Sequence, residues 1–512
     1  MSFIHSTSKK TAAFLSYINQ GLSTVFAIFL TPILLKYLGV DEYGLYQMVY
    51  SVGHYIMILD LGIGMVMVRY ISEYRARNDK EGEENFAALI AIFTVFIALL
   101  VFIAGEILNF NVENIFPNLT TSDYEKSHQM FNLMVIQFVF TVVDHYFAGI
   151  IGAHERFVFS RLMGIIKIVL SFTLNVLFVM LGFGAVGLVL TNTLVIILLT
   201  LVNILYVFKQ LHFRIHYHKW DFVIVKPAIG LMLAMLLQSV VGFVNSSVDK
   251  TILGIMCTKA DVAVYSIAAS IITLFNTLPT VISGLFQPQV TKMVVRGTTP
   301  SKLTDLVIRV GRWQFMMCGL FLLGIAFLGM DFLHLWVGHR LNHDQLLFTW
   351  IIMMVILPFN MVPLVQTVCI SVLNAYDKRM YRSVILAGMC VINIFVSVLM
   401  VRLFGPIGCP IGTAFSFLFG YAILLNIYYS KGLHLEIGRM FKEIVSKTWL
   451  CLLLAALLVS PLLLWKHCTL PIFILKAIVF SVVFFVLMWL FGFNEEEKNI
   501  CSPILRKLHL IR

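Results

Sequence analysis

Ionisable side chains occur inside stretches that are otherwise apolar enough to dissolve in hydrocarbon. These ionisable residues within apolar stretches are Asp60, Asp144, Lys167, Asp249 and Lys250. A charge within a membrane costs free energy, so it usually faces the interior of the protein or a water-filled cavity, and it indicates a transport pathway. A cation there can pair with a phosphate or carboxylate, and neutral hydroxyl and amide groups can replace water around a sugar. The chemistry that these residues suggest is therefore binding rather than catalysis.

Polar and small residues also recur along one face of several apolar stretches. The longest such stripe runs from Ser266 to Gln287 at spacings of three or four residues, and positions with this spacing share a helix face. Two interpretations are open, because small and weakly polar residues also let membrane helices pack closely. Shorter stripes in five other stretches, including those around Gln137 and Asn360, favour a central cavity.

Depth along the expected helices separates these charges. At about 1.5 Å per residue, Asp249 and Lys250 lie near the outer rim of the stretch 228–256, where the long lysine side chain can reach the interface. Adjacent helical residues do not face each other, so each needs its own partner. The pair is either a rim element that steers a substrate or latches a gate, or an anchor that fixes this helix at the interface. His54 lies near the midplane and serves either ion coupling or hydrogen bonding.

The elements that position these residues are membrane helices. Of 512 residues, 60% are hydrophobic and 12% charged, with a mean hydropathy of +0.93, whereas soluble domains are about 25% charged. Runs of about 20 apolar residues recur along the chain, so we expect an all-α polytopic membrane protein. The fourteen expected spans are 12–36, 44–67, 86–108, 129–152, 161–182, 186–208, 228–256, 262–290, 312–334, 346–373, 382–403, 407–430, 447–465 and 470–492.

The distribution of Lys and Arg predicts the orientation. With the N-terminus inside, the inner segments hold 28 basic residues and the outer loops hold 6, which predicts an N-in/C-in topology. Basic inner loops facing anionic lipid account for most of the net charge of +11, so nucleic acid is not an expected partner. The loops are too short for a catalytic domain, and His212, His216 and His218 lack accompanying ligands. We therefore expect neither an enzyme nor a metal or cofactor.

Internal similarity predicts two halves. The motif "GVDEYGLY" (39–46) is echoed by "TKADVAVY" (258–265), and two further pairs recur at nearly the same offset. Six spans per half make a parallel repeat. We expect lobes at 1–208 and 228–430, an amphipathic linker at 209–227 and a second amphipathic segment at 431–446. Two additional helices at 447–493 and a tail at 494–512 complete the chain.

Four stretches carry a resemblance to a known family. They are "LTPILLKYLGVDEYGLY" (30–46), "LDLGIGMVMVRYISEY" (59–74), "GAHERFVFSRL" (152–162) and "DKTILGIMCTKADVAVYSIA" (249–268), followed by "FQP" at 286–288. The sequence resembles Wzx-type O-antigen and polysaccharide flippases of the multidrug/oligosaccharidyl-lipid/polysaccharide exporter superfamily, over about residues 11 to 430. The lack of arginines in the first span makes lipid II itself a less suitable substrate.

The resemblance implies a multi-pass protein of the bacterial inner membrane that moves an undecaprenyl-pyrophosphate-linked oligosaccharide outward by alternating access. Its implied partners are that glycolipid, membrane lipid and the polysaccharide polymerase machinery, and the coupling ion, H⁺ or Na⁺, stays open. A cation-coupled multidrug exporter of the same superfamily is the alternative. Arg69, Lys167 and Lys250 are candidates for binding pyrophosphate. The residues expected to line the cavity are Gln20, His54, Asp60, Arg69, Gln137, Asp144, Lys167, Gln238, Asn245, Asp249, Lys250, Thr273, Thr277, Gln287 and Asn360.

Overall fold

The computed structural model describes residues 2–220, 222–461, 469–499 and 502. Within these residues every regular element is a helix. The chain divides into two compact units, residues 1–266 and 267–512, and each is described by itself. The expected all-α class is confirmed, whereas the expected lobe boundaries at 208 and 228 stay a prediction.

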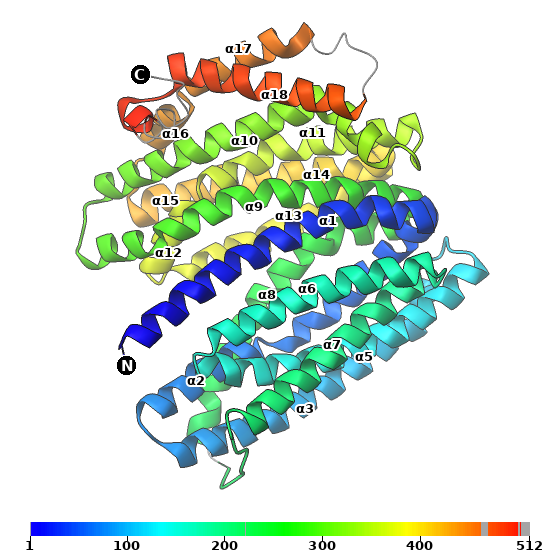
Figure 1. The fold of residues 1–512 in the computed structure, drawn as a ribbon, viewed down its shortest axis with the longest axis vertical. Coiled ribbons are helices and arrows are strands. Elements are labelled where there is room, and N and C mark those ends of the chain that lie inside the picture. The colour runs from blue at the N-terminus through cyan, green and yellow to red at the C-terminus, as the bar shows by residue number, and fades with distance from the viewer. Residues whose placement is uncertain (1, 221, 462–468, 500–501, 503–512) are drawn as a thin grey trace. The chain divides into compact units, whose positions relative to one another are not determined.

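The first unit consists of long helices joined by short turns (Figure 1). Helix α5 packs against α3 and α7, α1 packs against α6, and α8 packs against α1 and the short 3₁₀ helix η1. Its elements are α1 (Ser2–Gly53), η1 (His54–Asp60), α2 (Ile63–Ala76), α3 (Lys80–Phe110), α4 (Val112–Ile115), α5 (Thr121–Ala153), α6 (Phe157–Met180), α7 (Gly184–Lys209), α8 (Phe222–Met256) and the first turns of α9 (Lys259–Val295).

The second unit contains the rest of α9 and the remaining helices. Helix α10 packs against α11, α16, α17 and α18, and α13 packs against α14. The elements are α10 (Pro300–Val337), α11 (His343–Val365), α12 (Thr367–Ala375), α13 (Arg379–Phe404), η2 (Gly405–Ile407), α14 (Gly408–Phe417), η3 (Leu418–Leu425), α15 (Asn426–Leu433), α16 (Ile437–Val445), α17 (Thr448–Val459), α18 (Leu470–Leu487) and η5 (Met488–Gly492).

Ten helical stretches among the described residues are long and apolar enough to cross a membrane. Two of them, Phe14–Ala76 and Met380–Leu433, each include two of the fourteen expected spans. In the first, α1 is interrupted at Gly39, whose φ of 78° and ψ of 176° are not helical, so α1 consists of two helical segments that meet at this kink. The membrane class is confirmed, while the number of fourteen spans and the N-in/C-in orientation stay predictions.

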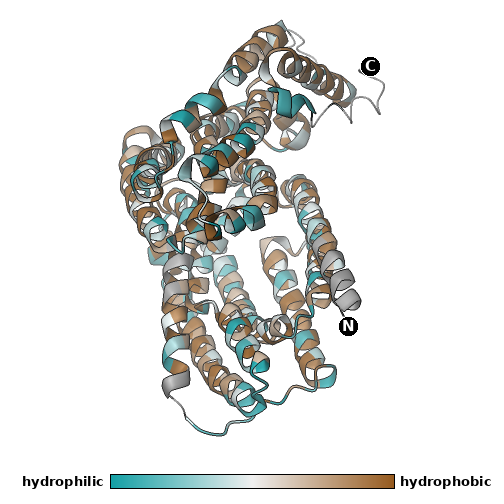
Figure 2. Cartoon of the chain, turned by 90° about the vertical axis from the view of Figure 1, so that its left-hand side faces the viewer, coloured by the Kyte–Doolittle hydropathy of each residue, from teal (hydrophilic) through white to brown (hydrophobic). Residues whose placement is uncertain are grey.

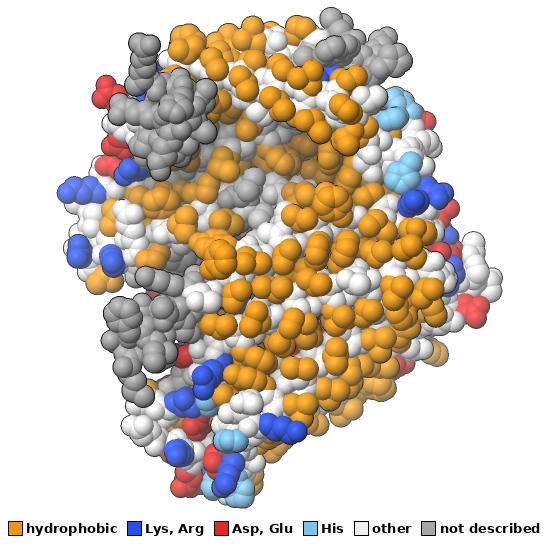
Figure 3. Space-filling model, viewed as in Figure 1, with side chains coloured by type: hydrophobic (Ala, Val, Ile, Leu, Met, Phe, Trp, Pro, Cys, Tyr) orange, Lys and Arg blue, Asp and Glu red, His pale blue; other side chains and the backbone are white. Residues whose placement is uncertain are grey.

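The surface of α6 and α7 shows why these helices suit a bilayer. Their outer faces expose Leu and Ile side chains such as Leu162, Ile166, Leu194, Leu198 and Leu205, at the spacing of one helix face. Hydrophobic side chains cover this region in Figure 3, and hydrophobic residues occupy most of the helical turns in Figure 2. A surface made mostly of such apolar side chains matches hydrocarbon.

The segment after α7 has no regular secondary structure over residues 212–220. Asn85 of α3, which is 3% exposed, holds it through its side-chain amide. The amide oxygen accepts hydrogen bonds from the backbone N–H groups of His218 and Lys219, and the amide nitrogen donates to the carbonyl of Lys219. The expected linker is thus fastened to the first unit by one buried side chain.

Candidate functional site

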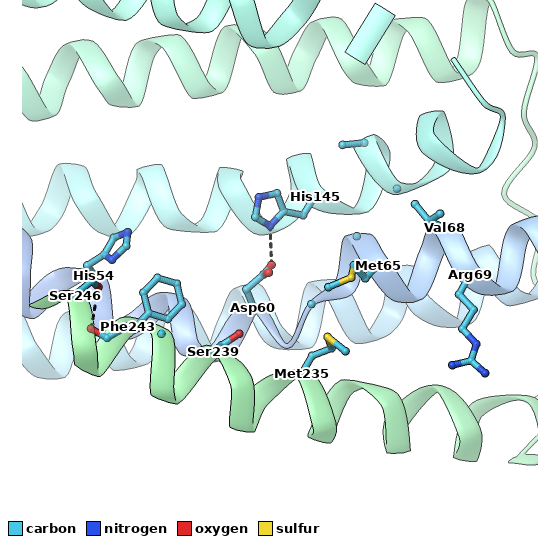
Figure 4. Close-up of a pocket in the computed structure, with 15 residues that line it drawn as sticks. His54, Asp60, Met65, Val68, Arg69, His145, Met235, Ser239, Phe243 and Ser246 are labelled. Atoms are coloured by element: carbon cyan, nitrogen blue, oxygen red, sulfur yellow. Dashed lines mark hydrogen bonds and ion pairs between the residues drawn. The ribbon is translucent and has the colours of Figure 1, made fainter. Parts of the chain in front are cut away.

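A cavity of about 840 Å³ lies within the first unit, between η1, α2, α5 and α8 (Figure 4). Its wall combines charged, hydroxyl, aromatic and apolar side chains with several glycines. The lining residues are His54, Asp60, Gly62, Gly64, Met65, Val68, Arg69, His145, Ala148, Gly149, Met235, Ser239, Gly242, Phe243 and Ser246. Three of the residues expected from the sequence, His54, Asp60 and Arg69, are brought together here.

The helix that carries Asp60 is broken beside the cavity. Residues 54–60 form a 3₁₀ helix, and then Leu61 and Gly62 adopt left-handed conformations, with φ of 54° and 66°, before α2 begins. Glycine adopts such a conformation without the steric cost that a side chain brings. Non-helical backbone at membrane depth is tolerated where it is buried in protein or lines a cavity, and broken helices form the binding sites of many transporters. The break therefore marks this cavity as a candidate site.

Asp60 pairs with His145 of α5 in the wall of the cavity. The Nδ1 atom of His145 lies 3.0 Å from Oδ1 of Asp60, and the two side chains are 42% and 16% exposed. A carboxylate that has such a partner is stabilised in a medium that would otherwise disfavour its charge. The pair provides the cavity wall with an acid and an imidazole in direct contact.

Close packing of α2 on α5 places this pair. A Cβ atom added to Gly64 would lie 3.1 Å from the carbonyl oxygen of His145, and one added to Gly149 would lie 2.8 Å from the carbonyl oxygen of Gly64. Small residues at such positions let the backbones of two membrane helices approach. Because the helices touch at these glycines, His145 reaches Asp60 directly.

The remaining lining residues differ between the two ends of the cavity. The guanidinium of Arg69 lies 5.7 Å from the ring centroid of Tyr70 and extends from α2 at one end in Figure 4. At the other end the ring of Phe243 meets that of His54 edge-on, with centroids 4.8 Å apart, and Ser246 of α8 lies beside them. The cavity thus offers a cation at one end and aromatic and hydroxyl groups at the other.

The charge pair near the end of α8 has partners on other turns and helices. Lys250 Nζ donates to Oε1 of Gln47 at 3.0 Å, and the buried Asp249 accepts a hydrogen bond from the hydroxyl of Tyr265. Neither residue is among those lining the cavity. Both interpretations of this pair, a rim element or an interfacial anchor, stay predictions.

The other expected residues of the first unit are not among those that line the cavity. Asp144 accepts a hydrogen bond from Asn203 of α7 at 2.8 Å, Gln137 lies on α5, and Gln20, Lys167 and Asn245 are exposed. The side chain of Gln238 lies outside the described residues. The stripe on α5 identified Asp144 and missed His145, its neighbour in the sequence, because only the tertiary packing tells which of the two faces Asp60.

The four expected residues of the second unit lie on α9 and α11. Asn360 is 5% exposed and donates to Oδ1 of Asn276 at 2.6 Å, while Thr273 and Thr277 donate to carbonyls one turn back in their own helix. Gln287 is exposed. Their role as lining residues stays a prediction. Among the described residues, no group of three or more His, Cys, Asp or Glu could hold a metal ion.

A family model described as "polysaccharide biosynthesis protein" matches residues 11–292, which is more than half of the chain and includes the whole cavity. The chain belongs to this family. The expected relationship to polysaccharide flippases is thereby confirmed at the level of the family. No curated protein matches the sequence.

Solved structures with the same fold are membrane transporters. One is the lipid II flippase MurJ in an inward closed conformation, with a TM-score of 0.73 and 15% identity, covering 97% of this chain and 99% of that one. Another is an inward-facing multidrug resistance transporter of the MATE family, of the MOP superfamily, with a TM-score of 0.64 and 16% identity, covering 78% and 92%. At such identities the likeness establishes the fold, and this chain of the polysaccharide biosynthesis family is a multi-pass membrane protein.

Proposed function

We propose that this protein is a flippase that moves an undecaprenyl-pyrophosphate-linked oligosaccharide across the bacterial inner membrane by alternating access. The observation that carries this proposal is the cavity beside the broken second span, with Asp60, His145 and Arg69 in its wall. Family membership and a fold shared with a lipid II flippase support it. On this proposal the protein is a transporter and not an enzyme.

The lining groups match the parts of such a glycolipid. Transferring hydroxyls and anions from water into hydrocarbon costs several kcal/mol or more for each group, so a headgroup needs replacement partners along its path. We assign the pyrophosphate to Arg69, because guanidinium groups bind phosphate in a bidentate manner. The hydroxyls of Ser239 and Ser246 and the face of Phe243 would receive the sugar. The orientation with Arg69 at the cytoplasmic end follows the predicted topology.

A second candidate is a cation-coupled multidrug exporter. Its specific support is the apolar part of the wall, which includes Met65, Val68, Met235 and Phe243 around a single acid, Asp60. The likeness to a multidrug transporter of the MOP superfamily points the same way. An organic cation would bind such a wall through its apolar surface and pair with the carboxylate.

Deletion of the gene in its native host separates the two candidates. A flippase deletion is expected to accumulate lipid-linked oligosaccharide in the inner leaflet and to lose the surface polysaccharide, both measurable by mass spectrometry of extracted lipids and by gel analysis of surface glycans. Re-expression of the intact chain should reverse both changes. Normal surface glycan together with increased sensitivity to cationic drugs would contradict the flippase and support the exporter.

A further inference from the structure

Beyond Ser246, the end of α8 and the turn that joins it to α9 contact η1 and α1 in successive layers. In the first layer Thr251 Oγ1 lies 3.3 Å from Ser51 Oγ and 3.2 Å from the hydroxyl of Tyr55. Lys250 then reaches Gln47 on the next turn of α1. All these residues belong to the first unit, so the contact is internal to it.

In the last layer the backbone of Lys259 lies so close to Gly44 of α1 that only a glycine fits there. A Cβ atom added to Gly44 would overlap the carbonyl oxygen of Lys259 and lie 2.7 Å from its carbonyl carbon. These are backbone atoms, which cannot move aside as the end of a flexible side chain can. Gly44 has an ordinary helical conformation, where glycine costs about 0.5–1 kcal/mol relative to alanine. The backbone angles therefore do not require glycine, and only the close approach of Lys259 does.

The two sides of this contact are held differently. On the α1 side, Glu42 accepts a hydrogen bond from Lys126 of α5 at 3.1 Å and one from the backbone N–H of Ala185 in α7 at 3.0 Å. On the side of the α8–α9 turn, the Nζ atom of Lys259 lies 2.6 Å from Oδ2 of Asp123 at the start of α5. That ion pair has side chains 23% and 11% exposed, so water can replace it when the turn moves away.

We propose that Gly44 and Lys259 form a closure of the cavity, in which the α8–α9 turn seals against α1 and the Asp123–Lys259 ion pair holds it shut. Gly44 is the positioning residue, because any side chain at this position keeps the turn from closing. This inference rests on the proposed function, since a closure on the outer side is needed only where a cavity opens alternately to the two faces of the membrane. It assigns that closure to contacts outside the substrate-binding wall.

Accessibility of a cysteine in the cavity tests this proposal without a substrate. Ser246→Cys is introduced together with Cys257→Ser, which removes the native thiol of the turn. Right-side-out membrane vesicles are then labelled with a sulfonated, membrane-impermeant maleimide. We expect Gly44→Val to increase the labelling rate of Cys at position 246 about tenfold, the change in open population that a shift of about 1.4 kcal/mol produces.

Matched controls separate opening from unfolding. Gly21→Val places the same side chain on α1 where a Cβ meets nothing within 4 Å, and it should leave labelling unchanged. The native thiols of Cys369 and Cys409, each 0% exposed, should stay unlabelled in every variant. Lys259→Ala should raise labelling as Gly44→Val does, and Lys259→Arg, which preserves the ion pair, should restore the parent rate.

The proposal is overturned if Gly44→Val and Lys259→Ala both leave labelling at the parent rate. Increased labelling of position 246 that is accompanied by labelling of Cys369 and Cys409 in both variants also overturns it, because opening is then global. Neither outcome bears on lipid-linked sugars, so failure of the closure is distinguishable from failure of the flippase assignment, which the gene deletion tests separately.

Discussion

At the scale of single residues, the central feature is a carboxylate held in the membrane part of the chain by a histidine from another helix. Asp60 lies directly before the break in its helix, and His145 reaches it because Gly64 and Gly149 bring the two helices together. Charged residues in such surroundings are costly and are usually functional. The strongest prediction at this scale therefore concerns this ion pair.

Asp60→Asn keeps the shape of the side chain and removes its charge. Because hydrogen bonds to charged groups contribute about 1.5–3 kcal/mol, we expect this variant to restore surface polysaccharide in the deletion strain at least about tenfold less well than the intact chain. The measurement is surface glycan per copy of membrane-inserted protein.

Glu73→Gln provides the matched control for Asp60→Asn. Glu73 also lies on α2 and pairs with Arg77 at 2.5 Å, but both side chains are well exposed, and exposed ion pairs contribute only about 0–1 kcal/mol. We expect this variant to behave as the intact chain does. Full restoration by Asp60→Asn would show that the charge in the cavity is dispensable.

At the scale of elements, the backbone departs from helical geometry at two places in the first unit: beside the cavity, and where a side chain of another helix hydrogen-bonds the backbone. The break after Asp60 borders the cavity, and the irregular segment 212–220 is fastened to α3 by the side chain of Asn85. Within this segment, the ring of Phe213 meets that of His154 edge-on. The Nδ1 atom of His154 lies 2.9 Å from the carbonyl oxygen of Ile150, and burial lowers the pKa of His154.

Asn85→Ala removes three hydrogen bonds from the linker, and Asn85→Asp removes only the one that the amide nitrogen donates. Loss of a hydrogen bond that leaves a buried group unpaired costs about 1–3 kcal/mol, so we expect tryptic cleavage after Arg214 and Lys219 to accelerate strongly in the alanine variant. The aspartate variant should fall between it and the intact chain. Cleavage fragments are quantified by mass spectrometry, and equal rates in all three proteins would contradict this role.

At the scale of the whole molecule, each compact unit is stabilised by contacts between residues far apart in the sequence. In the second unit α18 packs on α10, where the Nζ atom of Lys476 lies 2.7 Å from Oδ2 of Asp331. Lys476 is 2% exposed. Arg312 of α10, which is 3% exposed, donates to the carboxylate of Glu497 near the end of the chain. Helices α17 and α18 are therefore integral to this unit, whose core includes side chains of both.

Asp331→Leu leaves the ammonium group of Lys476 without its carboxylate inside the packed helices. Breaking a buried ion pair by removing one partner costs about 3–5 kcal/mol, whereas replacing both partners with apolar residues is often neutral. We expect Asp331→Leu to lower the Tm in detergent clearly, and the double variant Asp331→Leu, Lys476→Met to recover most of the loss. A double variant as unstable as the single one would show that the charge pair itself stabilises the unit.

The sequence was informative wherever a property depends on neighbours along the chain. Hydropathy predicted the membrane helices, and the motifs around Asp60 and after Asp249 indicated the polysaccharide flippase relationship that the family match confirms. The structure places His54, Asp60 and Arg69 in the wall of one cavity, since η1 and α2 follow one another directly, and their role in binding substrate stays a prediction. The linker's attachment to Asn85 had no signal in the sequence, because an asparagine in the charged first turns of α3 resembles any solvent-exposed polar residue.

The sequence by itself determined which helix faces suit lipid and which suit water or protein. It also determined that charges occur in stretches where hydrocarbon does not tolerate them, because both properties follow from side-chain transfer free energies. What only the tertiary structure decided is which of those charges meet. His145, and not its neighbour Asp144, faces Asp60 because of the rotation of α5 about its axis. The backbone of Lys259 approaches Gly44 because a glycine there lets the two backbones touch. Rotation and approach are set by packing between distant segments, which no local pattern encodes.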